Sequence, residues 1–525
     1  MTRWGFALVC VLAMAGRASA APALSLADLI KSGDREDALK MIGSGADVNA
    51  AQPDGTTPLH WAVYKVDPEI VKTLLAHGAK ANVVNNFGST PLAEAVKVAD
   101  VDMVRQLLKA GAKVDTANAD GQTALMLAAR TGEVKVAELL VHHGANVNER
   151  EMWRGQTPLM WAAAEGHAEM TEYLIAHHAN ISIRAITNEW PSQITSEPRA
   201  QYRPTGGLTP LLYAVRSGCV RCVQAILKAG ADINLPTPDG VTPLISAIDN
   251  LNFDVAKFLL EKKADPNTWD WWGRTPLYVA VDMNSYGPRF GPPVLHPDQT
   301  TAMDIIKLLL AAGVNPNSQL DMHRPGRGGN SGRFTDDPLT TGATPLLRAA
   351  IAFDNDAIRV LLDHGALVDL PNAMGLTPLM VAAGLGVSVR DIRGTYTGDV
   401  QSRALPTLEV LVKAGADVNA VVNDTSGHTA RIARPSTMTN RQGQTAIYGP
   451  INWGWTRVVQ FLLAHGAQVN IADASGKTPI DATKGDAGGR DYKAAPDVAA
   501  LIKGAAEAQR AVASAPQPPA ARITH

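Results

Sequence analysis

Two cysteines three residues apart are the side chains of this chain best suited to redox or metal chemistry. They are Cys219 and Cys222, and their C-x-x-C spacing is typical of a redox pair or of half a zinc site. A four-thiolate zinc site would need a second chain, because the sequence holds no second C-x-x-C motif. Covalent haem attachment is excluded, since no histidine follows Cys222. We predict no metal site and no cofactor, and we regard the pair as a candidate disulfide.

Three uses of the cysteine pair stay open. In an oxidising compartment the two thiols can close a local disulfide or stay buried and inert. The start of a helix makes a thiol more acidic, and Cys219 lies near the predicted start of one, so the pair can also be redox-active. A metal half-site completed by another chain is the third use.

Histidines and familiar catalytic motifs offer no further chemistry. Four histidines recur directly before a Gly-Ala pair, at His77, His143, His364 and His465. One histidine per repeat puts neighbours about 10 Å apart, too far to share a metal, so we interpret them as structural. The sequence contains no H-E-x-x-H, no G-x-S-x-G and no dinucleotide glycine pattern. We therefore predict that the chain is not an enzyme.

The elements that position these residues are repeated. A triplet similar to T-P-L recurs eleven times, and six of the ten spacings between neighbouring triplets are 33 residues. Threonine is a good helix N-cap and proline fits the first helical turn. A second apolar helix follows in each repeat and ends at a glycine suited to a left-handed cap. The triplets begin at Thr57, Thr90, Thr123, Thr157, Thr209, Thr242, Thr275, Thr344, Thr377, Thr445 and Thr478.

This pattern resembles the ankyrin repeat, whose signature T-P-L-H-x-A stands whole at residues 57–62. The resemblance covers about residues 25–505 and implies an all-α repeat solenoid of about 11 repeats plus an N-terminal cap. Each repeat would hold an inner and an outer helix, joined to the next repeat by a β-hairpin finger. A capping helix is predicted at 496–513 and a disordered Pro/Ala tail at 511–525.

Longer spacings mark five inserts. We predict them at about 184–206, 284–300, 318–341, 385–403 and 420–441. The second and fourth lie between the two helices of a repeat, and the others lengthen fingers. Their basic residues are all arginine, and aromatic residues lie among them. Arginine forms planar pairs with carboxylates and stacks on aromatic rings, so these arginines either bind a partner or clamp the long loops onto the solenoid through backbone carbonyls.

The resemblance also implies where a partner binds, namely the finger tips and inner helices of the concave face. Three tryptophans on one finger, Trp269, Trp271 and Trp272, either contact a partner or cover the adjacent inserts as a satellite core. Trp61, Trp161 and Tyr213 precede the alanine pair of the inner helix and are interpreted as structural. The predicted partner-binding residues are Phe87, Trp153, Arg154, Trp190, Trp269, Trp271, Trp272, Arg289, Phe290, Arg324, Arg327, Arg333, Arg393 and Tyr396.

One repeat departs from the pattern. Gly449 and Pro450 stand where alanines belong, and proline inside a helix costs about 3 kcal/mol. We expect a short or distorted inner helix there, which leaves the directions of Trp453 and Trp455 open.

Residues 1–20 look like a secretory signal peptide. Arg3 precedes an apolar run, and Ala18-Ser19-Ala20 matches an A-x-A cleavage site. We therefore expect cleavage after Ala20, export, and a periplasmic location. The run is too short to span a membrane. The formal net charge is −2, so the chain lacks the excess of positive charge that nucleic-acid binding requires.

The sequence thus favours a non-catalytic scaffold that binds one or more proteins in a bacterial cell envelope. A thiol–disulfide activity at the cysteine pair and a secreted, host-directed effector are the alternatives. The sequence does not identify the partner or the oligomeric state.

Overall fold

The computed structural model describes residues 24–193, 201–286, 298–321, 338–387, 399–423, 441–484 and 496–514. The predicted signal peptide lies outside these residues. The chain divides into two compact units, residues 1–152 and residues 153–525. Among the described residues, no helix is both long and apolar enough to cross a membrane.

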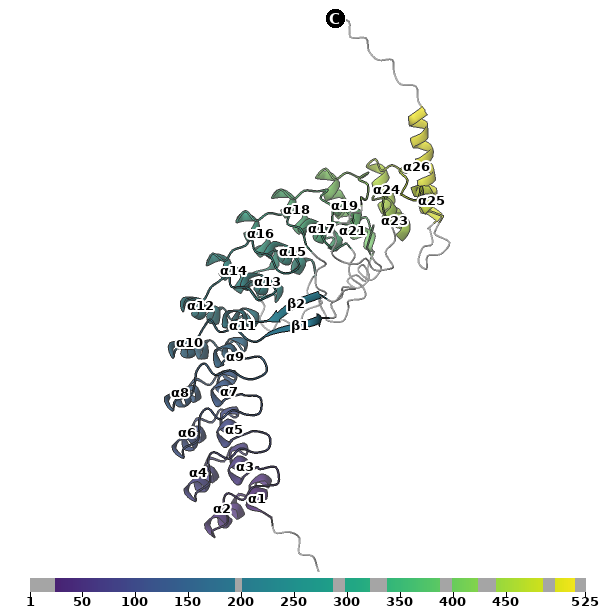
Figure 1. The fold of residues 1–525 in the computed structure, drawn as a ribbon. Coiled ribbons are helices and arrows are strands. Elements are labelled where there is room, and N and C mark those ends of the chain that lie inside the picture. The colour runs from purple at the N-terminus through teal and green to yellow at the C-terminus, as the bar shows by residue number, and fades with distance from the viewer. Residues whose placement is uncertain are drawn as a thin grey trace, which may run out of the picture. The chain divides into compact units, whose positions relative to one another are not determined.

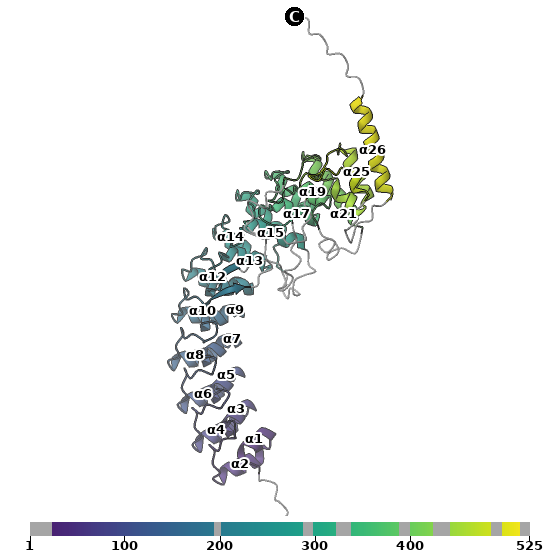
Figure 2. The same ribbon diagram turned by 45° about the vertical axis from the view of Figure 1, so that its right-hand side comes forward.

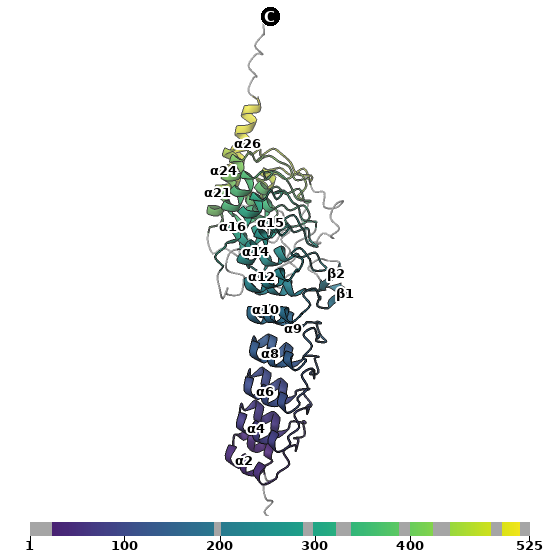
Figure 3. The ribbon, with the colours of Figure 1, turned by 90° about the vertical axis from the view of Figure 1, so that its left-hand side faces the viewer.

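Unit 1 is a stack of helix pairs in two rows (Figure 1). The inner row contains α1 (Leu26–Ser32), α3 (Pro58–Tyr64), α5 (Pro91–Lys97) and α7 (Ala124–Thr131). The outer row contains α2 (Arg35–Gly43), α4 (Pro68–Ala76), α6 (Val101–Lys109) and α8 (Val134–His142). The fingers between the pairs follow one another along a single edge of unit 1 (Figure 3).

The T-P-L triplets start the inner helices as the sequence predicts. At α5, Thr90 Oγ1 accepts a hydrogen bond from Ala93 N at 3.1 Å, and Pro91 takes the first helical position, where no N–H is needed. Leu92 and Ala95 are buried, and the small alanine lets neighbouring helices pack closely. Stacking is therefore what covers the apolar face of each pair.

A buried histidine links the first two fingers to the inner row. His60 is 3% exposed, and its Nε2 lies 3.1 Å from Ser89 O. Its Nδ1 lies 2.8 Å from Thr57 Oγ1. Burial lowers the pKa of His60, so the neutral ring donates from Nε2 and accepts at Nδ1. The histidine of the signature thus has a structural role.

Asparagine side chains tie the loops after successive outer helices together. In unit 1, Asn49 donates to Gly78 O at 3.0 Å and accepts from Lys80 N at 2.8 Å. Because one side chain satisfies both a carbonyl and an N–H of the next loop, each such bracket fixes the spacing of two repeats. Equivalent brackets form at Asn82 with Gly111 and Lys113, at Asn317 with Gly365 and Leu367, and at Asn419 with Gly466 and Gln468.

Asp369 occupies this bracket position and completes it only in part. Its Oδ2 accepts from Asp417 N at 2.9 Å, but a carboxylate has no donor for the next carbonyl. Its Oδ1 is buried and has no hydrogen-bond partner among the described residues. Burial raises the pKa of Asp369, and the nearby charge of Asp417 raises it further. The negative charge is therefore unfavourable at neutral pH.

We expect Asp369→Asn to stabilise unit 2 by about 1 kcal/mol at pH 7, because the amide supplies the missing donor and removes the charge. Urea unfolding of the mature chain measures this gain. The folded pKa of Asp369 lies above its unfolded value, so protonation stabilises the native protein and the gain should shrink as pH falls through that folded pKa. Asp115→Asn is the matched control, since Asp115 holds the same position but is exposed. An equal, pH-independent gain at both positions would contradict the explanation.

Unit 2 repeats the two-row arrangement. Its inner row contains α9 (Pro158–Ala164), α11 (Pro210–Ser217), α13 (Pro243–Asp249), α15 (Pro276–Tyr286), α17 (Pro345–Ala352), α19 (Pro378–Ala382), α23 (Tyr448–Trp453) and α25 (Pro479–Ala482). The outer row contains α10 (Ala168–Ala176), α12 (Val220–Lys228), α14 (Phe253–Glu261), α16 (Ala302–Ala311), α18 (Asn355–Asp363), α21 (Val400–Lys413), α24 (Thr456–Ala464) and α26 (Pro496–Ser514).

The lengthened fingers of unit 2 are paired at their bases. In the first, β1 (Thr187–Gln193) and β2 (Gln201–Gly206) form an antiparallel hairpin in which Thr187 faces Gly206; the strands are labelled in Figure 1, and Figure 2 shows the same ribbon after a turn of 45°. In the second, Leu320 N donates to Ala343 O at 3.0 Å. In the third, Val422 N donates to Gln444 O at 2.8 Å. The two chain ends of each long finger therefore meet as in an ordinary one.

Two inserts partly extend helices rather than forming loops throughout. α15 continues to Tyr286, into the insert predicted at 284–300, and α21 begins at Val400, within the insert predicted at 385–403. α26 also runs through Ser514, so the prediction of a disordered tail from 511 is wrong for residues 511–514. The alanine-rich sequence favours a helix there.

The irregular repeat has a late inner helix. α23 starts at Tyr448 instead of directly after Thr445, which puts Pro450 in the first turn, where its missing N–H costs nothing. A side chain at Gly449 would lie 2.5 Å from Leu385 N and 2.6 Å from Ala383 O. Glycine therefore lets the end of α19 approach α23 closely.

Candidate partner-binding surface

The finger tips are held rigidly by side chain to backbone and backbone to backbone hydrogen bonds. In unit 1, Asn85 Oδ1 accepts from Phe87 N at 3.1 Å and from Ser89 N at 2.9 Å, which closes the turn. Asn86 N donates to Asp54 O of the preceding finger at 2.8 Å. Gly88 has φ +73°, and a Cβ there would lie 2.7 Å from Ala119 N of the following finger. Each tip is therefore braced by its neighbours.

Large apolar side chains stand exposed on the fingers and inner row of unit 1. Phe87 is 71% exposed at its tip, and Met152 is 72% exposed. On α3, Tyr64 is 60% exposed and its ring meets Trp61 edge-on at 5.7 Å. Neither Tyr64 nor Met152 is among the predicted partner-binding residues, although Tyr64 holds an inner-helix position that the resemblance assigns to the binding face and Met152 directly precedes the finger-tip pair Trp153 and Arg154.

In unit 2 the finger that begins this unit carries Trp153 and Arg154, which are both exposed, Trp153 by 75%. The backbone behind them is fixed, because Arg154 O accepts from Ile186 N at 2.6 Å. A large ring and a guanidinium on a fixed turn are the residue types that dominate the energetics of protein interfaces.

The three tryptophans of the finger before α15 differ in their exposure. Trp269 is 65% exposed. Trp271 and Trp272 are half-buried, and the guanidinium of Arg274 lies 5.1 Å from the ring centre of Trp272. Trp271 N also donates to Asp239 O of the preceding finger at 2.9 Å. Trp269 is thus available to a partner, whereas the other two also support the finger.

Beneath this finger lies a group of buried charges. Arg274 Nε donates to Asp270 Oδ2 at 2.7 Å, and its Nη1 reaches Asp249 Oδ1 at 3.4 Å. Burial opposes the charge of Arg274, but the carboxylates of Asp249 and Asp270 outweigh it and raise the pKa of Arg274. Farther along the inner row, Arg348 on α17 pairs with Asp282 on α15, and both side chains are almost completely buried. These ion pairs join separate elements of the inner row and its finger.

Comparison with known sequences agrees with this architecture. A model of ankyrin repeats in three copies matches residues 26–118, 100–186, 188–270 and 211–287. The chain contains ankyrin repeats. Ankyrin repeats generally mediate protein–protein interaction and are scaffolds rather than enzymes.

Curated relatives share these repeats over part of their length. A putative palmitoyltransferase of Danio rerio is 30% identical over 174 residues, which are 33% of this chain and 22% of that protein. The mitochondrial disaggregase of Homo sapiens is 32% identical over 181 residues, 34% of this chain and 24% of the relative. Inversin of Gallus gallus is 37% identical over 75 residues, 14% of this chain and 7% of the relative. The chain thus spans less than a quarter of each.

Only some of the arginines and aromatic residues of the inserts lie within the described residues. Arg184, at the base of the first long finger, donates from Nη1 to Gly207 O and to Pro236 O, both at 2.9 Å. This arginine clamps the finger onto the next ankyrin repeat. Trp190 lies on β1, and the remaining predicted contact residues, Arg289, Phe290, Arg324, Arg327, Arg333, Arg393 and Tyr396, lie outside the described residues. Their binding role stays a prediction.

In the irregular ankyrin repeat, both tryptophans point toward the core. Trp453 Nε1 donates to Gly384 O at 2.8 Å, and the rings of Trp453 and Trp455 stack with centres 6.0 Å apart. Trp455 is 8% exposed. Both rings therefore pack between α19 and α23 as part of the core.

The two cysteines form a disulfide in the structure. Cys219 is the N-cap of α12, and its Sγ accepts from Cys222 N at 3.1 Å. Cys222 is fully buried, while Cys219 is half-buried. The described residues contain no cluster of three or more residues that could ligate a metal.

Proposed function

We propose that this chain is an exported, non-catalytic scaffold that binds a protein partner in a bacterial cell envelope. Its exposed finger-tip aromatics, Phe87 in unit 1 and Trp153 and Trp269 in unit 2, supply the main contacts, and the arginine-rich inserts add to them. Support comes from the combination of 65–75% exposure with a fixed backbone. Rigid aromatic anchors lose little conformational entropy on binding, so they contribute strongly to affinity.

Affinity capture from a periplasmic extract tests this proposal. The bait is the mature chain from Ala21 onward, with Phe87→Ala in one variant and Trp153→Ala and Trp269→Ala in another. We expect one protein to be retained by the native chain and lost, with binding weakened at least about tenfold, in one or both variants. The matched control replaces Leu308 and Leu367 with alanine, since these are also exposed but lie away from finger tips.

Equal retention by all variants would overturn the finger-tip surface. Trimming residues 322–337 and 424–440 then tests the inserts separately. Export is tested by fractionation and by sequencing the N-terminus, which should begin at Ala21. Recovery mainly from a host cytosol would replace the cell-envelope location with the host-directed alternative.

A thiol–disulfide activity is the second candidate, because the half-buried sulfur of Cys219 caps the start of α12. A redox-active pair should have a reduction potential near that of its compartment, and a structural disulfide a much lower one. Titration with a dithiol buffer distinguishes them. Full function in the Cys219→Ser/Cys222→Ser variant would end this alternative.

A further inference from the structure

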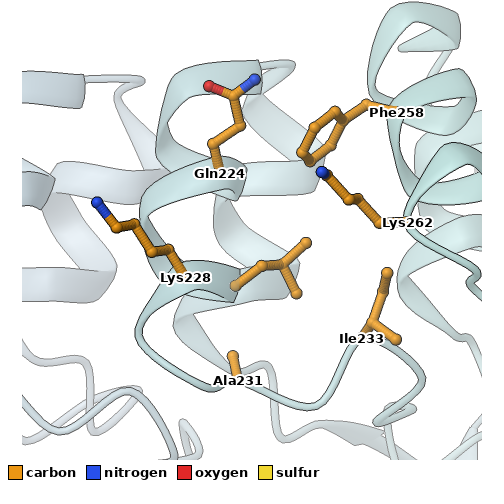
Figure 4. A pocket seen from close by; sticks show the side chains of 7 residues that line it. Gln224, Lys228, Ala231, Ile233, Phe258 and Lys262 are labelled. Carbon is orange, nitrogen blue, oxygen red and sulfur yellow. The ribbon is translucent and has the colours of Figure 1, made fainter.

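The outer row of unit 2 contains a groove on the side away from the fingers. It lies between the C-terminal halves of α12 and α14 and the loop after α12, with a volume of about 550 Å³. Figure 4 shows its lining, to which Leu227, Ile233 and Phe258 contribute the largest apolar side chains. These three are only half-buried in the protein itself, so a second molecule can cover them further.

The charged residues that line this groove are both lysines. Lys228 and Lys262, one from each side, are exposed, and none of the lining residues is acidic. Lys262 Nζ lies 5.6 Å from the ring centre of Phe258, and Figure 4 shows the two side chains next to one another. A ligand that fits this groove should therefore have an apolar body and negative charge at its edge.

We propose that this groove binds an acidic, amphipathic peptide segment of a partner protein. A bulky apolar side chain of the segment fills the space over Leu227, Ile233 and Phe258, and flanking carboxylates pair with Lys228 and Lys262. This surface is separate from the finger tips and goes beyond the function proposed above. It allows the scaffold to hold a second partner through its outer row.

The openness of the site favours a peptide over a free amphiphile such as a fatty acid. A small ligand is usually enclosed over most of its surface, whereas here the apolar residues form one wall and the lysines remain in solvent. When the peptide segment belongs to a larger protein, that protein covers the face of the segment that the groove leaves open. Helix-in-groove recognition of this kind uses a few apolar anchors at helical spacing.

Fluorescence polarisation on the full mature chain tests the proposal. The probe is a labelled helical peptide with a leucine and a phenylalanine on one face and glutamates along both edges of that face. We expect it to bind, and we expect Lys228→Glu/Lys262→Glu to weaken binding about tenfold. Leu227→Ala should also weaken it. The matched controls are Lys109→Glu/Lys135→Glu, with the same change in net charge, and Leu75→Ala, at the position on α4 that Leu227 holds on α12.

Four further probes decide the chemistry. A peptide with lysine for each glutamate and one with alanine for both apolar anchors should bind at least about tenfold more weakly. Sodium dodecanoate and phosphatidylglycerol vesicles should not compete. The proposal is overturned if the groove variants bind like their controls, if the lysine peptide binds as well, or if dodecanoate or vesicles displace the probe. Since finger-tip variants should bind the probe normally, failure here is distinct from failure of the proposed function.

Discussion

Gly449→Ala is expected to destabilise unit 2 by about 3 kcal/mol. The added methyl group would lie within 2.6 Å of two backbone atoms of the turn that follows α19, Leu385 N and Ala383 O. Backbone atoms cannot rotate away as a side chain can, so α23 has to move from α19. That movement also separates Trp453 from Gly384 O. Urea unfolding followed by tryptophan fluorescence should show a lower midpoint.

The matched control for this substitution is Gly504→Ala. Gly504 is also helical, on α26, but no atom lies within 4 Å of the position of an added Cβ. Alanine there should stabilise the helix by about 0.5–1 kcal/mol. If both variants unfold at the same urea concentration, close approach of α19 and α23 is not what requires glycine.

Arg348→Met is expected to cost about 3–5 kcal/mol, because it removes a guanidinium that pairs with the buried carboxylate of Asp282. The methionine has similar bulk, so the main change is the loss of charge and of the hydrogen bond from Nε. Thermal and urea unfolding of the mature chain give the loss. Hydrogen exchange should locate it in α15 and α17.

Two comparisons show whether the buried charge is the cause. Arg105→Met removes an exposed pair with Asp102 in unit 1 and should cost less than about 1 kcal/mol. The double variant Asp282→Leu/Arg348→Met should be more stable than Arg348→Met alone, because it also removes the buried carboxylate with which Arg348 pairs. A double variant that is less stable than the single one would exclude this explanation.

Features that depend on neighbouring residues were predictable from the sequence. A threonine followed by proline caps a helix through bonds that span three residues, so the start of α17 at Pro345 follows from Thr344 alone. The period of 33 residues predicted where the two chain segments at the base of a long finger must meet. In the structure, Leu320 pairs with Ala343 and Val422 with Gln444 at these points. Local chemistry and counting were sufficient for these features.

Features that depend on distant residues were not predictable in this way. Arg348 and Asp282 are 66 residues apart, and nothing in the repeat pattern joins them. The direction of Trp453 depends on Gly384, 69 residues earlier. The late start of α23 was expected only as a distortion, because its register depends on the close approach at Gly449. The groove likewise depends on Phe258 of α14, where α12 has the smaller Ala225.

The paired bases of the long fingers bear on how such a chain diversifies. Where two strands of a finger already meet, as at Ala185 and Leu208 or at Val422 and Gln444, further residues enter as a loop whose closure entropy grows only logarithmically with length. Doubling such a loop costs about 0.6 kcal/mol, a small fraction of the stability of a domain. Insertions and deletions at these points are therefore nearly neutral, and natural selection can vary the recognition sequence while the helical stack that carries it stays unchanged.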